Sequence, residues 1–176
     1  MDLSRYQAAD FDRGAPVWKE ALWRLCQGFF FQALWPVPSS WRVGLLRWFG
    51  ARIGARAVIR AGVNISFPWR LEMGDDVWIG EEVMILSLAP VRLGSNVCLS
   101  QRSFLCTGWH DRHRETFDLV VKPITIHSGC WVAAAAFVGP GVDMPSGTVL
   151  AAGAVLVKSP EKPGMYAGNP ARAIGV

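Results

Sequence analysis

The stretch that decides the fold is residues 126–156, IHSGCWVAAAAFVGPGVDMPSGTVLAAGAVL, in which an aliphatic side chain recurs at every sixth position. The aliphatic positions are Ile126, Val132, Val138, Met144, Leu150 and Leu156. Neither the 3.6-residue repeat of an α-helix nor the alternation of a simple strand produces this spacing. The stretch therefore predicts an architecture built on a six-residue unit.

The same period runs through the preceding part of the chain. It appears as three groups of three aliphatic residues, joined by two-residue slips, and fifteen extra residues precede Ile126. The groups are Ile53, Ile59 and Ile65; Met73, Ile79 and Ile85; and Leu93, Leu99 and Leu105. Small residues follow in phase, one position later at Gly54, Gly74, Gly80, Gly94, Ala133, Gly139 and Ala151, and four positions later from Ala57 to Ala154.

A period of six is expected of a coil of short strands wound as a triangular prism, with the aliphatic side chains pointing inward. Stacking would then pair each strand with the coils above and below it. We expect the small residues to let the chain turn each corner without a steric clash. A β-sandwich is the alternative, but its alternating strands would not hold one phase over 126–156.

This pattern resembles the hexapeptide-repeat acyltransferases over residues 53–175. The resemblance implies a left-handed parallel β-helix, a homotrimer, and acetyl-coenzyme A (acetyl-CoA) as co-substrate without a required metal. We expect three segments, namely an N-terminal helical cap over 1–52, the β-helix over 53–157 with a long loop at about 108–122, and a C-terminal capping segment over 158–176.

The N-terminal segment predicts two helices. The first, over 16–35, carries Trp18, Leu22, Leu25, Phe29 and Trp35, and the second, over 41–49, places Val43, Leu46 and Phe49 near one face and Arg42 and Arg47 on others. Because an open β-helix end exposes unpaired strand edges, we interpret both helices as its cap. The aromatic composition of the first is also typical of a helix at a membrane surface, so peripheral membrane contact is the alternative.

The excursion at about 108–122 is where chemistry is expected, since long loops on rigid scaffolds concentrate binding and catalysis. It opens with Thr107-Gly108-Trp109-His110. An imidazole with a pKa near 6.5 suits the removal of a proton from a weakly nucleophilic hydroxyl. Sugar-modifying members of the family carry a Thr-x-x-His step here, which implies that His110 is the general base. Trp109, Asp111 and His113 are candidate substrate contacts.

Non-catalytic interpretations of these residues remain open. His110 and His113 are alternatively side chains of a solvated loop, and His127 is expected at the surface. A zinc site from Cys106, His110, Asp111 and His113 is disfavoured because the spacing matches no structural zinc motif. The four cysteines lack a CxxC pair and are expected to be buried free thiols.

The donor site is implied by the resemblance. In this family coenzyme A lies in the groove between neighbouring prisms, and the matching positions here are Ala134, Ala152, Val157, Lys158 and Arg172. The small alanines would leave the backbone open to the pantetheine arm, and the two cations would meet phosphates. Ordinary surface charge is the alternative for Lys158 and Arg172.

Four motifs narrow the resemblance to the WcaF-type colanic acid acetyltransferases. They are Asp2-Leu3-Ser4, the run from Leu45 to Ala51, the run from Phe67 to Leu71, and the run from Leu105 to Asp111. This implies O-acetylation of a small-molecule or lipid-linked sugar in exopolysaccharide or related glycan synthesis. The stretch 84–88, MILSL, lacks the Asn and Asp of the maltose and galactoside enzymes. A metal-dependent, carbonic-anhydrase-like or scaffold β-helix is the competing interpretation.

Composition agrees with a globular enzyme. Half of the 176 residues are hydrophobic, 18% are charged and the net charge is +4, which suits an anionic thioester donor. No basic tract with interleaved aromatic residues indicates nucleic acid. The N-terminus has no signal-peptide pattern, so we expect a cytoplasmic protein.

Overall fold

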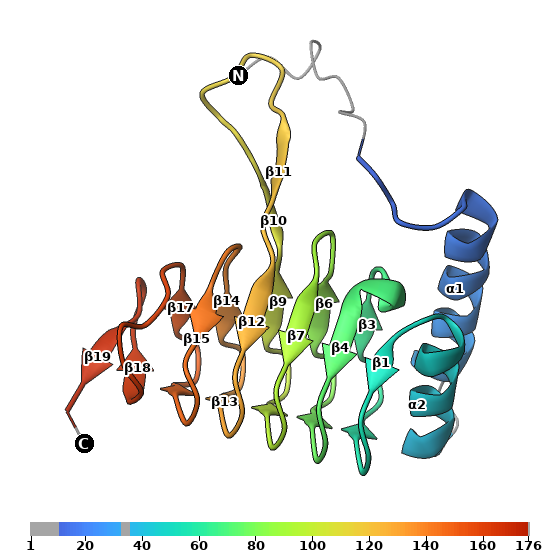
Figure 1. Ribbon diagram of the computed structural model, residues 1–176, viewed down its shortest axis with the longest axis horizontal. Helices are drawn as coiled ribbons and strands as arrows, with labels where there is room; N and C mark the ends of the chain where they lie inside the picture. Colours follow the sequence, from blue (N-terminus) through green and yellow to red (C-terminus); the bar gives the residue numbers. More distant parts are fainter. Residues whose placement is uncertain (1–10, 33–35, 176) are drawn as a thin grey trace.

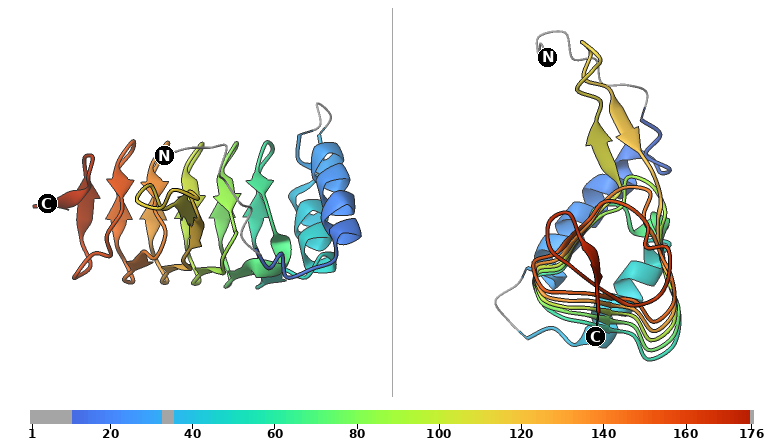
Figure 2. Two further views of the ribbon diagram at one scale, coloured as in Figure 1. Left: turned by 90° about the horizontal axis from the view of Figure 1, so that it is seen from above. Right: turned by 90° about the vertical axis from the view of Figure 1, so that its left-hand side faces the viewer.

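The computed structural model describes residues 11–32 and 36–175, which form two helices followed by a parallel β-helix (Figure 1). The helices are α1 (Val17–Phe30) and α2 (Ser39–Trp48), and η2 (Pro68–Arg70) is a short 3₁₀ helix. Seen along its axis the β-helix is a triangular prism with one sheet on each side (Figure 2). The predicted fold class is confirmed.

Three sheets make up the prism. The first contains β1 (Arg52–Ile53), β4 (Leu71–Met73), β7 (Val91–Leu93), β12 (Ile124–Ile126) and β15 (Asp143–Met144). The second contains β2 (Val58–Ile59), β5 (Trp78–Ile79), β8 (Cys98–Leu99), β13 (Trp131–Val132), β16 (Val149–Leu150), β18 (Met165–Ala167) and β19 (Arg172–Ile174). The third contains β3 (Asn64–Ile65), β6 (Met84–Leu86), β9 (Phe104–Cys106), β14 (Phe137–Val138) and β17 (Val155–Leu156).

The six-residue column forms the core of the prism. In the second sheet, for example, Ile59, Ile79, Leu99, Val132 and Leu150 lie in register on successive parallel strands. All the predicted inward aliphatics are buried except Ile53, which is half-buried beside the cap. Each of these strands therefore places one apolar side chain in a continuous core.

The small residues at the corners have a different role from the predicted one. A Cβ added at Gly94 would lie 2.5 Å from the backbone nitrogen of Ser128, in the next coil. The residue that turns the chain comes two positions later, where Asp76 and Asn96 both have a φ of 58°. The glycine column is thus required by close stacking of coils, and the left-handed turn is made by other residue types as well.

This packing predicts that Gly94→Ala lowers the free energy of unfolding by about 1–3 kcal/mol, because the methyl group must push two backbone segments apart. Gly28→Ala is the matched control. A Cβ at Gly28 meets nothing within 4 Å, and the position is helical, so stability should stay equal or rise slightly. Denaturant unfolding of both variants measures the difference, and equal stabilities would refute the stacking argument.

The helices cap the first coil, as predicted. They supply partners for its edge N–H groups: Ser39 Oγ accepts from the backbone of Ile59 at 2.7 Å, and Gln27 Oε1 accepts from that of Ile65 at 2.7 Å. Trp23 and Leu46 are fully buried between the helices and the prism. The open end is therefore closed by hydrogen bonds and by apolar packing.

Two details of the predicted cap are wrong. Helix α1 ends at Phe30, earlier than the predicted residue 35, while Trp35 lies outside the described residues. Arg42 is buried, and its guanidinium donates to the carbonyl oxygens of Phe30 at 3.0 Å and Ile59 at 3.2 Å. Burial lowers the pKa of Arg42. The long polar side chain ties the helices to the first coil.

The C-terminal end adds two strands to the second sheet. After the last full coil, β18 continues the second sheet beside β16, and β19 pairs with β18 in the antiparallel direction.

Of the four cysteines, only Cys130 is buried, and burial raises the pKa of its thiol. Cys26, Cys98 and Cys106 are free but partly exposed, so the prediction of buried thiols is wrong for these three.

Candidate active site

Every long connection of the β-helix leaves the same corner, between the third and the first sheet. In the first coil η2 occupies this corner, in the second residues 87–90 do, and in the third the excursion does. The excursion is a two-stranded antiparallel hairpin, β10 (Gly108–His110) and β11 (Leu119–Val121), which projects away from the prism (Figure 1). The predicted loop is therefore a β-hairpin beside the second coil.

His110 is oriented by the tip of this hairpin. Its ring stacks on Phe117 with centroids 4.4 Å apart and an interplanar angle of 5°. Its Nδ1 lies 2.8 Å from the carbonyl oxygen of Phe117. Because a carbonyl only accepts, Nδ1 must carry the proton of this hydrogen bond, and in the neutral ring Nε2 then carries the lone pair. In this tautomer Nε2 can accept a proton, as a general base must.

A cleft lies beside the hairpin. It has a volume of about 380 Å³ and is lined by Phe11, Asp12, Arg70, Leu88, Ala89, Pro90, Leu119 and Val121. Gly108 and His110 pair with Val121 and Leu119, so all four side-chain positions share one face of the ribbon. That face is the one that borders the cleft, although His110 itself does not line it.

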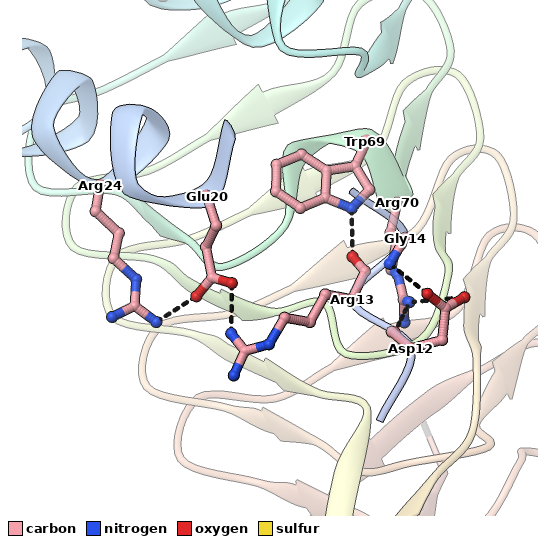
Figure 3. Close-up of polar contacts among 7 residues, drawn as sticks. All are labelled: Asp12, Arg13, Gly14, Glu20, Arg24, Trp69 and Arg70. Carbon is pink, nitrogen blue, oxygen red and sulfur yellow. Dashed lines mark hydrogen bonds and ion pairs between the residues drawn. The ribbon is translucent and has the colours of Figure 1, made fainter. Parts of the chain in front are cut away.

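Phe11 and Asp12, which line the cleft, belong to an N-terminal arm, residues 11–16, whose polar contacts are drawn in Figure 3. The indole of Trp69 donates to the carbonyl oxygen of Arg13 at 2.8 Å. Arg70 donates to the carbonyl oxygens of Asp12 and Leu88, and so joins the arm to the corner of the second coil. Glu20, on α1, is buried and paired with Arg13 and Arg24. These contacts hold the N-terminal arm against the corner of the second coil and against α1.

The predicted substrate contacts do not all face this cleft. Trp109 alternates with His110 along β10 and points to the other face of the ribbon, where the Lys122 ammonium lies 5.3 Å from its ring centroid. Asp111 accepts from the backbone nitrogen of His113 at 2.9 Å, and the His113 side chain is exposed. In the single chain, His110 is thus the candidate on the ribbon face that borders the cleft.

The predicted donor residues form two groups. Ala134 and Ala152 occupy equivalent turns in successive coils, at the corner between the second and third sheets, and the backbone nitrogen of Gly153 donates to the carbonyl oxygen of Ala134 at 2.9 Å. Lys158 and Arg172 line one pocket of about 270 Å³ at the C-terminal end, together with Tyr166. Val157 is exposed next to this pocket and does not line it.

His110 and the alanine pair lie on different corners of the prism. His110 extends from the corner between the third and first sheets, and Ala134 and Ala152 lie at the next corner. One chain alone therefore does not bring all the predicted residues into one site.

Comparison with known proteins places this architecture in a family. No family model matches the chain. WcaF of Escherichia coli (strain K12), a protein named as a colanic acid biosynthesis acetyltransferase, is 39% identical over 174 residues, which cover 99% of this chain and 96% of the relative. The chain belongs to the WcaF-type acetyltransferase family. The resemblance seen in the sequence is confirmed.

Solved structures share the fold of this WcaF-type chain. A hexapeptide-repeat-containing acetyltransferase from Vibrio cholerae, complexed with acetyl-CoA, superposes with a TM-score of 0.81 at 22% identity, covering 96% of this chain and 93% of that one. A galactoside acetyltransferase in complex with coenzyme A gives a TM-score of 0.83 at 23% identity, covering 95% and 84%.

The described part of the WcaF-type chain holds neither a cluster of metal ligands nor a membrane-spanning helix. Within residues 11–32 and 36–175, no three His, Cys, Asp or Glu side chains gather as metal ligands would, and this includes the set around Cys106 and His113. Across the same residues no helix is long and apolar enough to span a membrane. The Asp2-Leu3-Ser4 motif lies outside the described residues.

Sequence reasoning missed two residues that shape this site. Arg70 was read only as part of a family motif, yet it lines the cleft and holds the arm. Phe117 gave no signal, because its contact with His110 depends on the register of the hairpin.

The stretch 84–88 contributes no polar group to the site. Its one polar residue, Ser87, is buried, and its Oγ donates to the carbonyl oxygen of Phe67 at 3.1 Å, so it is closed to a substrate.

Proposed function

We propose that this chain transfers an acetyl group from acetyl-CoA to a sugar hydroxyl in exopolysaccharide or related glycan biosynthesis, with His110 as the general base. The observation that carries the proposal is the hydrogen bond from Nδ1 of His110 to the carbonyl oxygen of Phe117 at 2.8 Å. It fixes the tautomer and, with the stacked phenyl ring, the direction of the imidazole.

The reaction follows from that orientation. Nε2 of His110 accepts the proton of the acceptor hydroxyl as its oxygen attacks the thioester carbonyl carbon. Backbone N–H groups stabilise the resulting oxyanion, and the tetrahedral intermediate then expels the coenzyme A thiolate. The imidazolium returns its proton to that thiolate, so His110 ends the cycle neutral. The cleft bordered by Arg70 and the hairpin is where the acceptor sugar binds, as a free, nucleotide-linked or lipid-linked intermediate.

A homotrimer completes this site. The outward side of the second sheet carries an apolar column that runs almost its whole length, formed by Val58, Trp78, Cys98, Trp131, Val149 and Met165. Trp78 and Trp131 are exposed on the single chain. Aromatic residues on a strip of this kind are typical of a subunit interface. Packing a second prism there provides the groove in which the alanine corner of one copy faces the hairpin of the next.

Donor binding gives a separate prediction. Lys158→Ala and Arg172→Ala should each weaken acetyl-CoA affinity by about tenfold, since each removes one charge-assisted contact to a phosphate. Lys162→Ala is the control of matched charge: it lines the same pocket and is not assigned to the nucleotide. Calorimetric titration with acetyl-CoA measures the three affinities, and unchanged values for the first two variants would remove both residues from the donor site.

The same titration tests the function as a whole. We expect the full chain to bind acetyl-CoA, with no zinc dependence. Zinc binding without affinity for the thioester would instead favour a metal-dependent β-helix and would overturn the proposal.

A further inference from the structure

The helical cap has a second apolar surface, on the side that faces away from the prism. In α1, Trp18, Leu22, Leu25 and Phe29 share one helix face, and Trp18, Leu25 and Phe29 are 67%, 73% and 56% exposed. The opposite face carries the buried Trp23. The helix is therefore apolar on both sides, whereas capping the prism uses only one.

Helix α2 repeats this arrangement at the same end of the molecule (Figure 2). Its Val43 and Leu46 are buried, while Trp41 and Trp48 are 63% and 70% exposed. We call the six exposed side chains the outer cap face: Trp18, Leu22, Leu25, Phe29, Trp41 and Trp48. A terminal cap of a repeat fold ordinarily presents a polar surface to water, so this face needs an occupant other than solvent.

The charges of the cap indicate what that occupant is. Between residues 15 and 51 the sequence has four basic residues and one acidic residue, Glu20. Glu20 is buried and shared between Arg13 and Arg24, so this group keeps a net positive charge. Arg24 and Arg47 are exposed, and Arg47 also donates to the carbonyl oxygens of Ile53 and Gly54 in the first coil. Two copies packed cap to cap would bring like charges together without an exposed acid to compensate, whereas an anionic surface complements them.

We propose that the outer cap face docks on the surface of a bilayer containing anionic phospholipids, with α1 lying in the plane of the membrane. Tryptophan side chains prefer the interface between headgroups and acyl chains, and here three of the six residues are Trp. The net positive charge of the cap attracts the anionic lipid headgroups. The prism then stands on the membrane by its first coil. This docking does not depend on the acetyl-transfer reaction.

Vesicle co-sedimentation of the full chain tests the docking. We expect binding to vesicles of phosphatidylglycerol mixed with phosphatidylcholine, at least about tenfold weaker binding to phosphatidylcholine alone, and weakening by salt. The double variant Trp18→Ser, Leu25→Ser should lose at least about tenfold in partitioning to the mixed vesicles. Ile174→Ser, an exposed apolar residue at the far end of the prism, should bind like the wild type.

Conservative variants give a second readout that does not threaten folding. With lipids brominated on the acyl chains, the quenched fraction of tryptophan fluorescence should fall in Trp18→Phe and rise in Trp78→Phe, because only the first removes an indole from the outer cap face. Absence of wild-type binding to either vesicle would overturn the proposal, as would equal binding of the double variant. So would a mass by light scattering that is a multiple of the trimer and falls in the double variant, since a second copy would then cover the face.

Discussion

We expect His110→Ala to lower the rate of acetyl transfer by about 10²–10⁴-fold, the range that a positioned general base contributes. The imidazole is held by Phe117 on two sides, through the hydrogen bond at Nδ1 and through ring stacking. Removing it leaves the cleft and the donor residues in place. The loss should therefore appear in kcat, with acetyl-CoA affinity nearly unchanged.

The matched control is His127→Ala. His127 is an exposed histidine directly after β12 of the first sheet, and its Nε2 lies 2.9 Å from Asp143 Oδ1. Its loss should leave the transfer rate within about twofold of the wild type, as expected for a surface side chain. Comparable rates for the His110 and His127 variants would remove His110 from the mechanism.

The second large effect is expected in the core of the prism. Leu99→Ala should lower the free energy of unfolding by about 2–5 kcal/mol, the usual result of truncating a buried leucine. Leu99 is fully buried and stacked between Ile79 and Val132 in the second sheet. Parallel coils that share one continuous core relax little around such a cavity.

Leu25→Ala is the matched control, because it makes the same leucine-to-alanine truncation at an exposed position. Leu25 lies on the outer cap face and alanine is a good helix former, so the free energy of unfolding should change by less than about 0.5 kcal/mol. Denaturant unfolding compares the two variants. A loss at Leu99 no larger than at Leu25 would contradict the assignment of the six-residue column to the core.

The core was predictable because the β-helix repeats one local rule. Each inward position needs an aliphatic residue, and the stacked strands keep these positions in register from Ile53 to Leu156. Insertions at one corner leave the ladders undisturbed, which is why the two-residue slips and the excursion were visible as breaks in the period. The corner glycines were found as a column, but their physical cause, contact between coils, appears only when the coils are stacked.

The site was predictable only in part. His110 followed from a short motif, whereas its partner Phe117 and the cleft residue Arg70 depend on how the hairpin and the N-terminal arm fold back on the prism. Arg42 was expected on a different helix face from Val43 and Leu46, yet it is buried with them, and two backbone carbonyl oxygens accept from its guanidinium. Contacts across distant parts of the chain leave no periodic trace in the sequence.

The most direct test of the account is mass spectrometry of glycan intermediates after incubation with isotope-labelled acetyl-CoA and the full chain. We predict a labelled product heavier by one acetyl group, with the label removed by mild base as expected of an ester, and formed only at background level with the His110→Ala variant. Absence of labelled product across free, nucleotide-linked and lipid-linked sugars, or a base-stable label on an amine, would contradict O-acetyl transfer by this protein.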